Sequence, residues 1–107
     1  MSLVVEITEQ TFATEVLESN RPVFIDYWAD WCEPCKHLSP VIEELSQRYP
    51  QIKFCKVDTN MNATLAARQG VMSLPTLQVI VGGEVVVSQQ GSKTKAGLVQ
   101  MLSPYLE

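Results

Sequence analysis

The sequence predicts an α/β fold in which five strands form one mixed sheet and four helices flank it. Three observations support this prediction. Strand-like and helix-like runs alternate through the first half of the chain, which is typical of parallel strands joined by right-handed crossovers. The run 23–27 is almost continuously apolar, as in strands that are covered on both faces. Gly82-Gly83 joins two further apolar runs, and such a two-residue link indicates a hairpin of antiparallel strands.

Length and composition suit one folded unit. A chain of 107 residues, 46% hydrophobic and 19% charged, is long enough to bury a single core. The net charge of −4 provides no basic surface, so we expect neither nucleic acid nor a membrane as a partner. No apolar run approaches the roughly 18 residues of a membrane span, and Glu6 and Glu9 interrupt any secretory signal. We therefore expect one cytoplasmic, monomeric domain over residues 1–107.

The predicted elements follow from apolar periodicity and from the residues that end each run. In chain order they are a strand at 3–7, a helix at 8–19, a strand at 23–27, a helix that ends near residue 49, a strand at 52–57, a helix at 63–69, strands at 76–81 and 84–88, and a helix at 94–106. Thr8 is the expected N-cap of the first helix, whose buried face carries Phe12, Val16 and Leu17.

Prolines and a glycine mark several boundaries. Pro22 separates the first helix from the second strand, and Pro50 follows the end of the second helix. Pro40 lies inside that helix, where a proline removes one hydrogen bond and kinks the axis. Gly70 is the expected C-cap of the third helix.

The pattern Cys32-Glu33-Pro34-Cys35 stands where a predicted strand passes through a short loop into a helix. In that context, two thiols separated by two residues are typical of a redox motif. A helix N-terminus lowers the pKa of a thiol because free N–H groups and the positive end of the dipole stabilise the thiolate. Cys32 would be this nucleophile, and Cys35, one turn deeper, would resolve the mixed disulfide. Pro34 suits the first turn, where its missing N–H costs nothing.

A metal half-site is the alternative interpretation of the cysteine pair. Tetrahedral zinc takes four ligands, usually from two such pairs, and only Cys55 and His37 remain as further thiol and imidazole groups. Haem attachment would need histidine directly after Cys35, where the chain has Lys36. We therefore expect no metal. His37 is assigned to the solvated helix surface, where its charge could tune Cys32, and Cys55 to the core.

Asp26 lies inside a strand that should be covered on both faces. Burial raises the pKa of a carboxyl group unless it is paired, and a carboxyl held near neutrality could exchange protons with the dithiol. The alternative is an exposed acid at the end of the strand. Lys56, on the third predicted strand, either pairs with Asp26 or extends to water, and the sequence leaves both open.

Leu74-Pro75-Thr76 opens the fourth predicted strand, where a proline cannot donate a ladder hydrogen bond. A turn is expected there and a cis bond is one option, although the spacing alone favours an ordinary trans proline. Trp31, in the loop before the cysteines, is more typical of a contact surface than of a core.

Taken together, these residues resemble the thioredoxin family over essentially the whole chain. The matching positions, in the order and spacing of the family, are Phe12, 26–36, Pro40, 56–58, Gly70-Val71, 74–76, Gly82-Gly83 and Gly91. This set is highly specific, whereas the cysteine pair alone would not be.

The resemblance implies a thioredoxin fold, with a central five-stranded mixed sheet in the order 1-3-2-4-5 flanked by four helices. It implies an exposed nucleophile at Cys32, a buried resolving thiol at Cys35, and a buried acid–base group at Asp26 with Lys56 beside it. The implied substrate-binding residues are Trp31, Glu33, Pro34, Met72, Leu74, Pro75, which would be cis, and Gly91. Electrons would come from a separate NADPH-dependent thioredoxin reductase and pass to disulfide-containing client proteins, so the chain itself should hold no cofactor.

Glu33 stands where the family usually has glycine. A carboxylate beside Cys32 disfavours the thiolate by like-charge repulsion, and a less stabilised thiolate makes a weaker oxidant. We therefore expect a protein-disulfide reductase. The alternatives are an oxidase or isomerase in an oxidising compartment, and a thioredoxin-fold binding module in which the cysteines are incidental.

Overall fold

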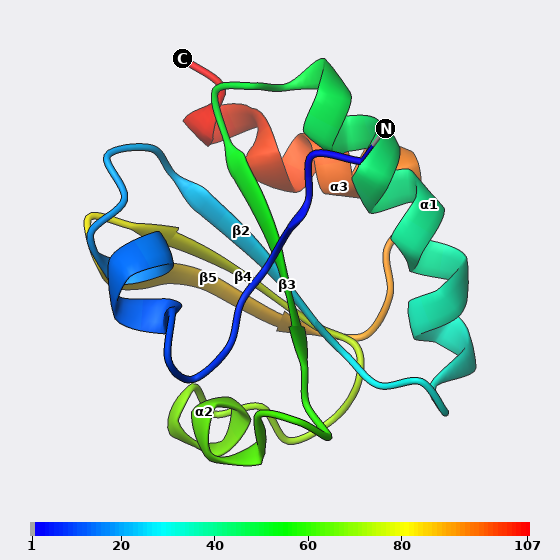
Figure 1. Ribbon diagram of the computed structural model, residues 1–107. Coiled ribbons are helices and arrows are strands. Elements are labelled where there is room, and N and C mark those ends of the chain that lie inside the picture. The colour runs from blue at the N-terminus through cyan, green and yellow to red at the C-terminus, as the bar shows by residue number, and fades with distance from the viewer. Residues whose placement is uncertain (1) are drawn as a thin grey trace.

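Five strands form one mixed sheet in the computed structural model, which describes residues 2–107. The strands are β1 (Val5–Glu6), β2 (Val23–Trp28), β3 (Lys53–Asp58), β4 (Thr76–Val81) and β5 (Glu84–Gln90). Their order across the sheet is β1-β3-β2-β4-β5, as the resemblance implied (Figure 1). β3 runs parallel to β1 and β2, whereas β4 is antiparallel to β2 and to β5. The predicted mixed sheet and its hairpin are therefore confirmed.

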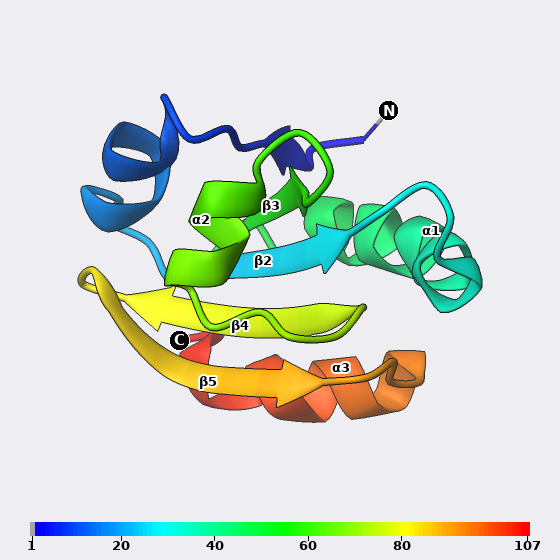
Figure 2. The ribbon, with the colours of Figure 1, turned by 90° about the horizontal axis from the view of Figure 1, so that it is seen from below.

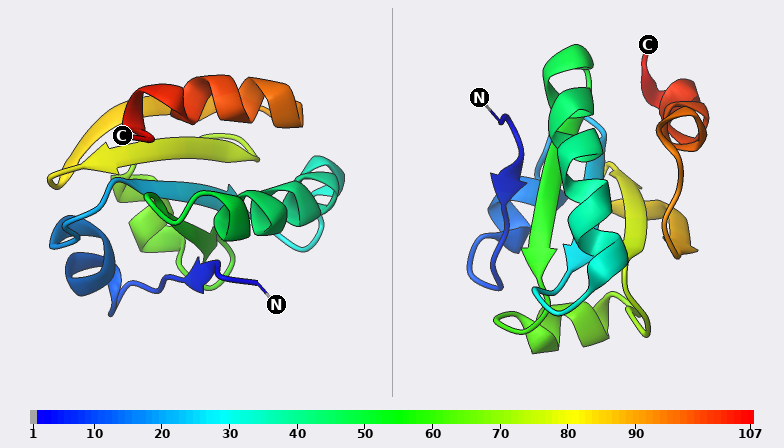
Figure 3. Two further views of the ribbon diagram at one scale, coloured as in Figure 1. Left: turned by 90° about the horizontal axis from the view of Figure 1, so that it is seen from above. Right: turned by 90° about the vertical axis from the view of Figure 1, so that its right-hand side faces the viewer.

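Helices cover both faces of this sheet (Figures 1 and 3). They are η1 (Ala13–Leu17), α1 (Glu33–Arg48), α2 (Ala63–Arg68) and α3 (Lys95–Leu102), and a short 3₁₀ turn, η2 (Ser103–Tyr105), follows α3. One core cluster lies under α1 and α3, and a second lies under η1 and α2. Because successive residues of a strand point to opposite faces, β2 directs Phe24 and Asp26 toward α1, and Ile25 and Tyr27 toward α2.

The first helical segment is shorter than predicted. A single π-helical turn, η1, replaces the longer helix expected there, and Leu17 is 43% exposed rather than buried with Phe12 and Val16. The expected N-cap at Thr8 is wrong, because the residue at the N-cap of η1 is Phe12, which makes no side-chain capping bond. Phe12 and Val16 lie four residues apart, so one turn buries both.

Most other elements end within two residues of their predicted bounds, and Pro40 lies inside α1 as expected. α3 is the exception. It ends at Leu102, four residues early, because Pro104 has no N–H to continue the helical bonding. Its N-cap is Thr94, whose hydroxyl accepts the N–H of Gly97 at 3.0 Å.

The C-terminus of α2 is closed by a Schellman motif, in which Gln69 is the C-cap and Gly70, the expected cap, is the left-handed residue that follows it. Gly70 has a φ of +74°, which glycine adopts without a steric penalty. The N–H of Gly70 donates to the carbonyl of Ala67 at 3.1 Å, and that of Val71 to Ala66 at 2.9 Å. The segment that follows α2 therefore starts from a fixed position.

The N-terminus of α2 is capped from a distant part of the chain. The carboxylate of Glu9 accepts the N–H of Leu65 at 3.1 Å, and the side chain of Asn62 accepts the N–H of Glu9 at 3.0 Å. Asn62 occupies the N-cap position but makes no capping bond to its own helix. This exchange resembles a capping box, except that its two partners are 53 residues apart in sequence.

Candidate active site

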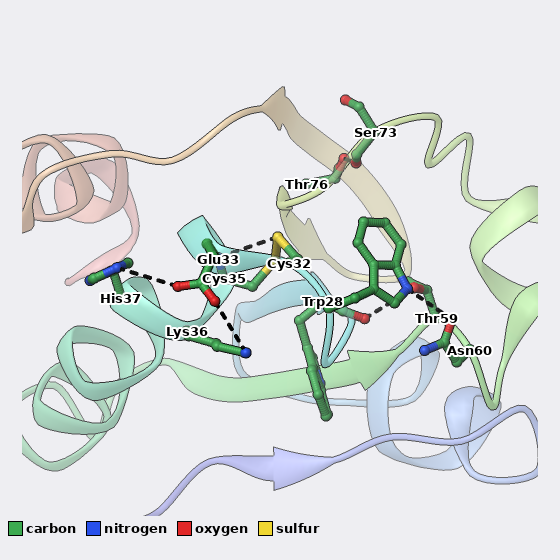
Figure 4. Close-up of a disulfide and its surroundings, with 11 residues drawn as sticks. Trp28, Cys32, Glu33, Cys35, Lys36, His37, Thr59, Asn60, Ser73 and Thr76 are labelled. Atoms are coloured by element: carbon green, nitrogen blue, oxygen red, sulfur yellow. Dashed lines mark hydrogen bonds and ion pairs between the residues drawn. A yellow bond between two sulfur atoms is a disulfide. The ribbon is translucent and has the colours of Figure 1, made fainter.

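β2 passes through a short loop into α1 (Figure 2), and the two cysteines lie at the start of that helix. Cys32 is the N-cap of α1, and its sulfur accepts the N–H of Cys35 at 3.3 Å. The two residues form a disulfide with their Cα atoms 5.3 Å apart (Figure 4). The predicted pair of facing sulfurs at the start of a helix is therefore confirmed. The unpaired N–H groups of the first turn are the donors that stabilise a thiolate at Cys32.

The expected contrast in exposure between the two cysteines is absent from this disulfide form. Cys32 is 4% exposed and Cys35 is 3% exposed, so the exposed Cys32 that the resemblance implied is not observed. Trp28 and Leu74 pack against the cysteines and cover them. The two sulfurs differ instead in their surroundings, because the sulfur of Cys32 accepts a backbone N–H while Cys35 lines a partly open cavity.

This cavity has a volume of about 240 Å³, and Asp26, Cys35, Ser39 and Lys56 are among the residues that line it. Asp26 is only 4% exposed, and its Oδ1 has no hydrogen-bond partner. Burial raises the pKa of Asp26 to about 7, and the positive charge of Lys56 opposes part of that rise. The predicted buried acid is confirmed, and the alternative of an exposed acid is wrong.

Lys56 is the direct neighbour of Asp26 in the parallel ladder of β2 and β3, and both residues line the same cavity. The ion pairs among residues 2–107 do not include these two side chains. The ammonium nitrogen of Lys56 lies 5.9 Å from the centre of the Trp28 ring, a cation–π distance. Lys56 thus acts on Asp26 through its charge and packs on an aromatic ring, which neither of the two sequence-based alternatives described.

The peptide bond between Leu74 and Pro75 is cis, as the resemblance implied, and the trans bond favoured by spacing alone is wrong. The carbonyl of Pro75 accepts the N–H of Gly91 at 2.8 Å, so the segment after β5 lies beside this turn. The hydroxyl of Thr76 donates to the carbonyl of Ser73 at 2.6 Å and closes the turn from within. Leu74 also packs against the cysteines, which brings the turn to the disulfide.

A second hollow, of about 220 Å³, lies between Trp31 and the segment 71–74. Trp31 is 67% exposed and Met72 is 86% exposed, so large apolar side chains stand open to solvent on its rim. Exposed apolar surface gathered beside a reactive bond is typical of a contact site. The prediction that Trp31 lies at a surface rather than in the core is confirmed.

Asn60 holds Trp31 in place, and sequence reasoning missed it. The indole nitrogen of Trp31 donates to Oδ1 of Asn60 at 3.4 Å, and the amide of Asn60 donates to Asp30 at 3.2 Å. Asn60 follows β3, whereas Trp31 follows β2. Parallel strands end at the same edge of a sheet, so only the pairing of β2 with β3 could have pointed to this contact.

Glu33 is 72% exposed and lies near two basic side chains (Figure 4). One carboxylate oxygen is 3.3 Å from the ammonium nitrogen of Lys36, and the other is 3.9 Å from Nε2 of His37. Exposed pairs of this kind contribute little to stability, yet the ammonium group of Lys36 offsets part of the negative charge beside Cys32. His37 lies on the solvated helix surface, as predicted.

The third cysteine is not part of the site. Cys55 is fully buried, and burial raises the pKa of its thiol to about 12. It is the small core residue that the sequence predicted. Across residues 2–107, His, Cys, Asp and Glu form no group of three or more that could hold a metal ion. In the same part of the chain, none of the helices has the length and apolar character needed to cross a membrane.

Comparisons with known proteins agree with this geometry. The Thioredoxin family model matches residues 3–104. The thioredoxin of Streptomyces clavuligerus is 44% identical over 94 residues, which cover 88% of both chains. Thioredoxin 1 of Nostoc sp. is 41% identical over 107 residues, which cover 99% of this chain and 100% of the other.

A solved structure and a fusion protein extend the comparison. A mutant thioredoxin from Halobacterium salinarum superposes with a TM-score of 0.90 and 32% identity, covering 100% of this chain and 96% of the other. The bifunctional thioredoxin reductase/thioredoxin of Mycobacterium leprae is 40% identical over 102 residues, which cover 94% of this chain and 22% of that protein.

Proposed function

This chain belongs to the thioredoxin family, and from that premise we propose how its residues share the work of disulfide reduction. The chain is a thiol–disulfide oxidoreductase whose redox centre is the pair Cys32 and Cys35. The main support for this function is the position of Cys32. Its sulfur lies at the N-cap of α1 and is bonded to that of Cys35. Both requirements of dithiol chemistry, an activated sulfur and a resolving one, are met in a single helical turn.

In the proposed reaction, the thiolate of Cys32 attacks one sulfur of a target disulfide. The other target sulfur leaves as a thiolate, and a mixed disulfide joins Cys32 to the target. The thiolate of Cys35 then attacks the sulfur of Cys32, which releases the second target thiol and leaves the Cys32–Cys35 disulfide. Two electrons pass from the cysteine pair to the target, and the two target thiolates take up protons.

Asp26 and Lys56 are the proposed acid–base residues. Cys35 must lose its proton before it attacks, and the cavity that contains Asp26 adjoins it. A carboxyl group with a pKa of about 7 takes and returns a proton readily near neutral pH. Lys56 keeps that pKa from rising further, because its positive charge favours the carboxylate.

The proposed substrate-binding residues surround the disulfide. They are Trp31, Glu33, Pro34, Met72, Leu74, Pro75 and Gly91. The open rim of the second hollow supplies apolar surface. An extended client segment would lie along the Leu74-Pro75 turn, beside the cysteines that Leu74 covers.

We propose that the whole chain acts as one monomeric domain, with disulfide-containing proteins as clients. A thioredoxin reductase that uses NADPH is the proposed electron donor, and the fusion named in Mycobacterium leprae supports it, because that protein joins the two activities in one chain. We place the reaction in the cytoplasm, where the compartment keeps thiols reduced. The unpaired Cys55 of the core is compatible with such a compartment.

A coupled assay tests this function. With NADPH, a thioredoxin reductase and insulin, the chain is expected to accelerate NADPH oxidation in proportion to its concentration. A second assay with dithiothreitol in place of the reductase tests the disulfide-reductase function separately from the proposed electron donor. Insulin reduction with dithiothreitol but not with the reductase would mean that only the proposed donor is wrong. No acceleration with either donor would contradict the reductase function itself.

Replacing Met72 with serine is expected to raise the KM for insulin while kcat stays unchanged. The methionine lines the second hollow and is open to a client. Its loss should raise KM roughly fivefold, which corresponds to about 1 kcal/mol of lost apolar contact. Met61 is a matched control, because it is 79% exposed and does not line that hollow. Equal KM values for Met72→Ser and Met61→Ser would contradict the proposed docking surface.

Replacing Glu33 with glycine is expected to make the dithiol more oxidising, because it removes a negative charge beside Cys32. The exposed carboxylate is already paired with Lys36 and His37, so the equilibrium constant with glutathione should change by only about twofold to fivefold. Lys36→Gln removes a positive charge and should shift the same equilibrium in the opposite direction. A Glu33→Gly protein that is equally or more reducing than the wild type would show that this interpretation of Glu33 is wrong.

A further inference from the structure

A polar side chain occupies the core where the strand pattern would suit an apolar one. Gln78 lies in β4, on the face of the sheet covered by η1 and α2, and is 1% exposed. Burying an amide group is unfavourable unless its hydrogen bonds are made. Its position among apolar neighbours therefore requires partners within the protein.

The side chain of Gln78 makes four hydrogen bonds to three residues. Its Oε1 accepts the hydroxyl of Tyr27 at 2.8 Å and the side-chain amide of Gln69 at 3.4 Å. Its Nε2 donates to the backbone carbonyl of Gln69 at 2.9 Å and to the hydroxyl of Ser88 at 3.2 Å. Both donors and both lone pairs of the side-chain amide are thus in use, and the same buried group contacts β2, β5 and the end of α2.

Two of these four bonds reach one residue, Gln69, which is the C-cap of α2. The chain then runs through residues 70–75, here called the docking loop, to the cis Pro75 beside the disulfide. β4 begins at Thr76, so Gln78 follows the far end of the docking loop by three residues. One side-chain amide therefore ties the start of the docking loop to the strand in which it ends.

We propose that Gln78 is a positioning residue that fixes the docking loop relative to the Cys32–Cys35 pair, and thereby sets the affinity for polypeptide disulfides. This inference rests on the proposed function, in which the docking loop contacts the client. An apolar residue at position 78 could pack against the core. It would have no N–H group to donate to the carbonyl of Gln69, so it could not fix the position of that carbonyl. A buried and fully satisfied amide network specifies one arrangement, and the arrangement specified here is that of the docking loop.

The test compares a protein substrate with a small one. Gln78→Leu is expected to raise the KM for insulin about tenfold, the loss associated with one or two buried hydrogen bonds, while kcat changes less than twofold. The rate with the small disulfide 5,5′-dithiobis(2-nitrobenzoate) should be unchanged, because such a molecule needs no extended groove. Amide hydrogen exchange in residues 70–74 should become faster, which reports the freed docking loop directly.

Two further variants separate positioning from stability. Gln78→Leu removes the acceptor of the buried Tyr27 hydroxyl, and Tyr27→Phe/Gln78→Leu removes that hydroxyl, so unfolding free energy should recover in the double variant. In the double variant the carbonyl of Gln69 still lacks the hydrogen bond from residue 78, so the raised KM for insulin and the faster amide hydrogen exchange should persist. Ser88→Ala is the matched control, because it removes a bond of the same amide that does not reach the docking loop.

The outcomes are distinct. If both the KM for insulin and the unfolding free energy return to their wild-type values in the double variant, the inference is overturned, because Gln78 would then have only a structural role. An unchanged KM in Gln78→Leu, with an active wild type, would overturn it as well. Inactivity of the wild type with both insulin and the small disulfide would instead contradict the proposed function.

Discussion

Cys32→Ser is expected to lose insulin reduction to the background level, a decrease on the order of a thousandfold or more, because a serine hydroxyl is a very poor nucleophile toward sulfur at neutral pH. The N-cap position that favours a thiolate at Cys32 cannot compensate, since a hydroxyl there remains protonated. The measurement is the rate of insulin reduction with dithiothreitol, at equal protein concentration and with unfolding curves to show that the variant is folded.

Two other cysteine variants serve as controls. Cys35→Ser keeps the nucleophile but lacks the resolving thiol, so it should accumulate a mixed disulfide with its client. Cys55→Ser should retain wild-type activity, because Cys55 is buried and its thiol pKa is raised to about 12. Undiminished activity in Cys32→Ser would show that Cys32 is not the nucleophile, and a client trapped by Cys32→Ser but not by Cys35→Ser would reverse the two roles.

Asp26→Asn is expected to be more stable than the wild type at pH 8.5 and nearly equal to it at pH 3.5. Burial raises the pKa of Asp26 from 3.8 to about 7, so the folded state holds this proton more tightly than the unfolded state does. Wild-type stability therefore falls as the pH rises from about 4 to about 7, and this loss is complete above pH 7. A rise of about three pKa units corresponds to about 4 kcal/mol at high pH.

The measurement is urea unfolding of the oxidised proteins across this pH range. Other carboxyl groups titrate too, so the difference between Asp26→Asn and the wild type isolates the contribution of Asp26. Lys56→Gln offers a control of opposite effect, because it removes the charge that lowers the pKa of folded Asp26 and should extend the decline, which still begins near pH 4, to higher pH. Parallel stability curves for Asp26→Asn and the wild type would show that the buried carboxyl has an ordinary pKa.

The active-site loop could be predicted because its determinants are adjacent in sequence. Cys32 and Cys35 are three residues apart, Pro34 favours the first helical turn, and an amphipathic run follows them. The hairpin at Gly82-Gly83 is local in the same way, and the structure confirms its antiparallel strands. The alternation of strands and helices then restricted the topology to a few arrangements.

Contacts between distant segments could not be predicted. The cap of α2 is Glu9, more than fifty residues away, and nothing near Asn62 indicates it. The contact of Asn60 with Trp31 and the partners of Gln78 depend on which strands are neighbours and in which register they pair. A periodic pattern describes which face of an element is apolar, but it does not state which residue of another element lies opposite.

For this protein, the sequence alone determined the reactive chemistry: two thiols at the start of a helix, an acid inside an apolar strand and a proline at the entry of a later one. Only the tertiary structure decided how that chemistry is tuned, through the near-equal burial of both cysteines, the raised pKa of Asp26, the placement of Lys56 on Trp28 and the cis bond at Pro75. The physical reason is distance along the chain. The start of a helix is set by neighbouring residues, whereas desolvation and Coulombic interactions depend on all the segments that fold around a group.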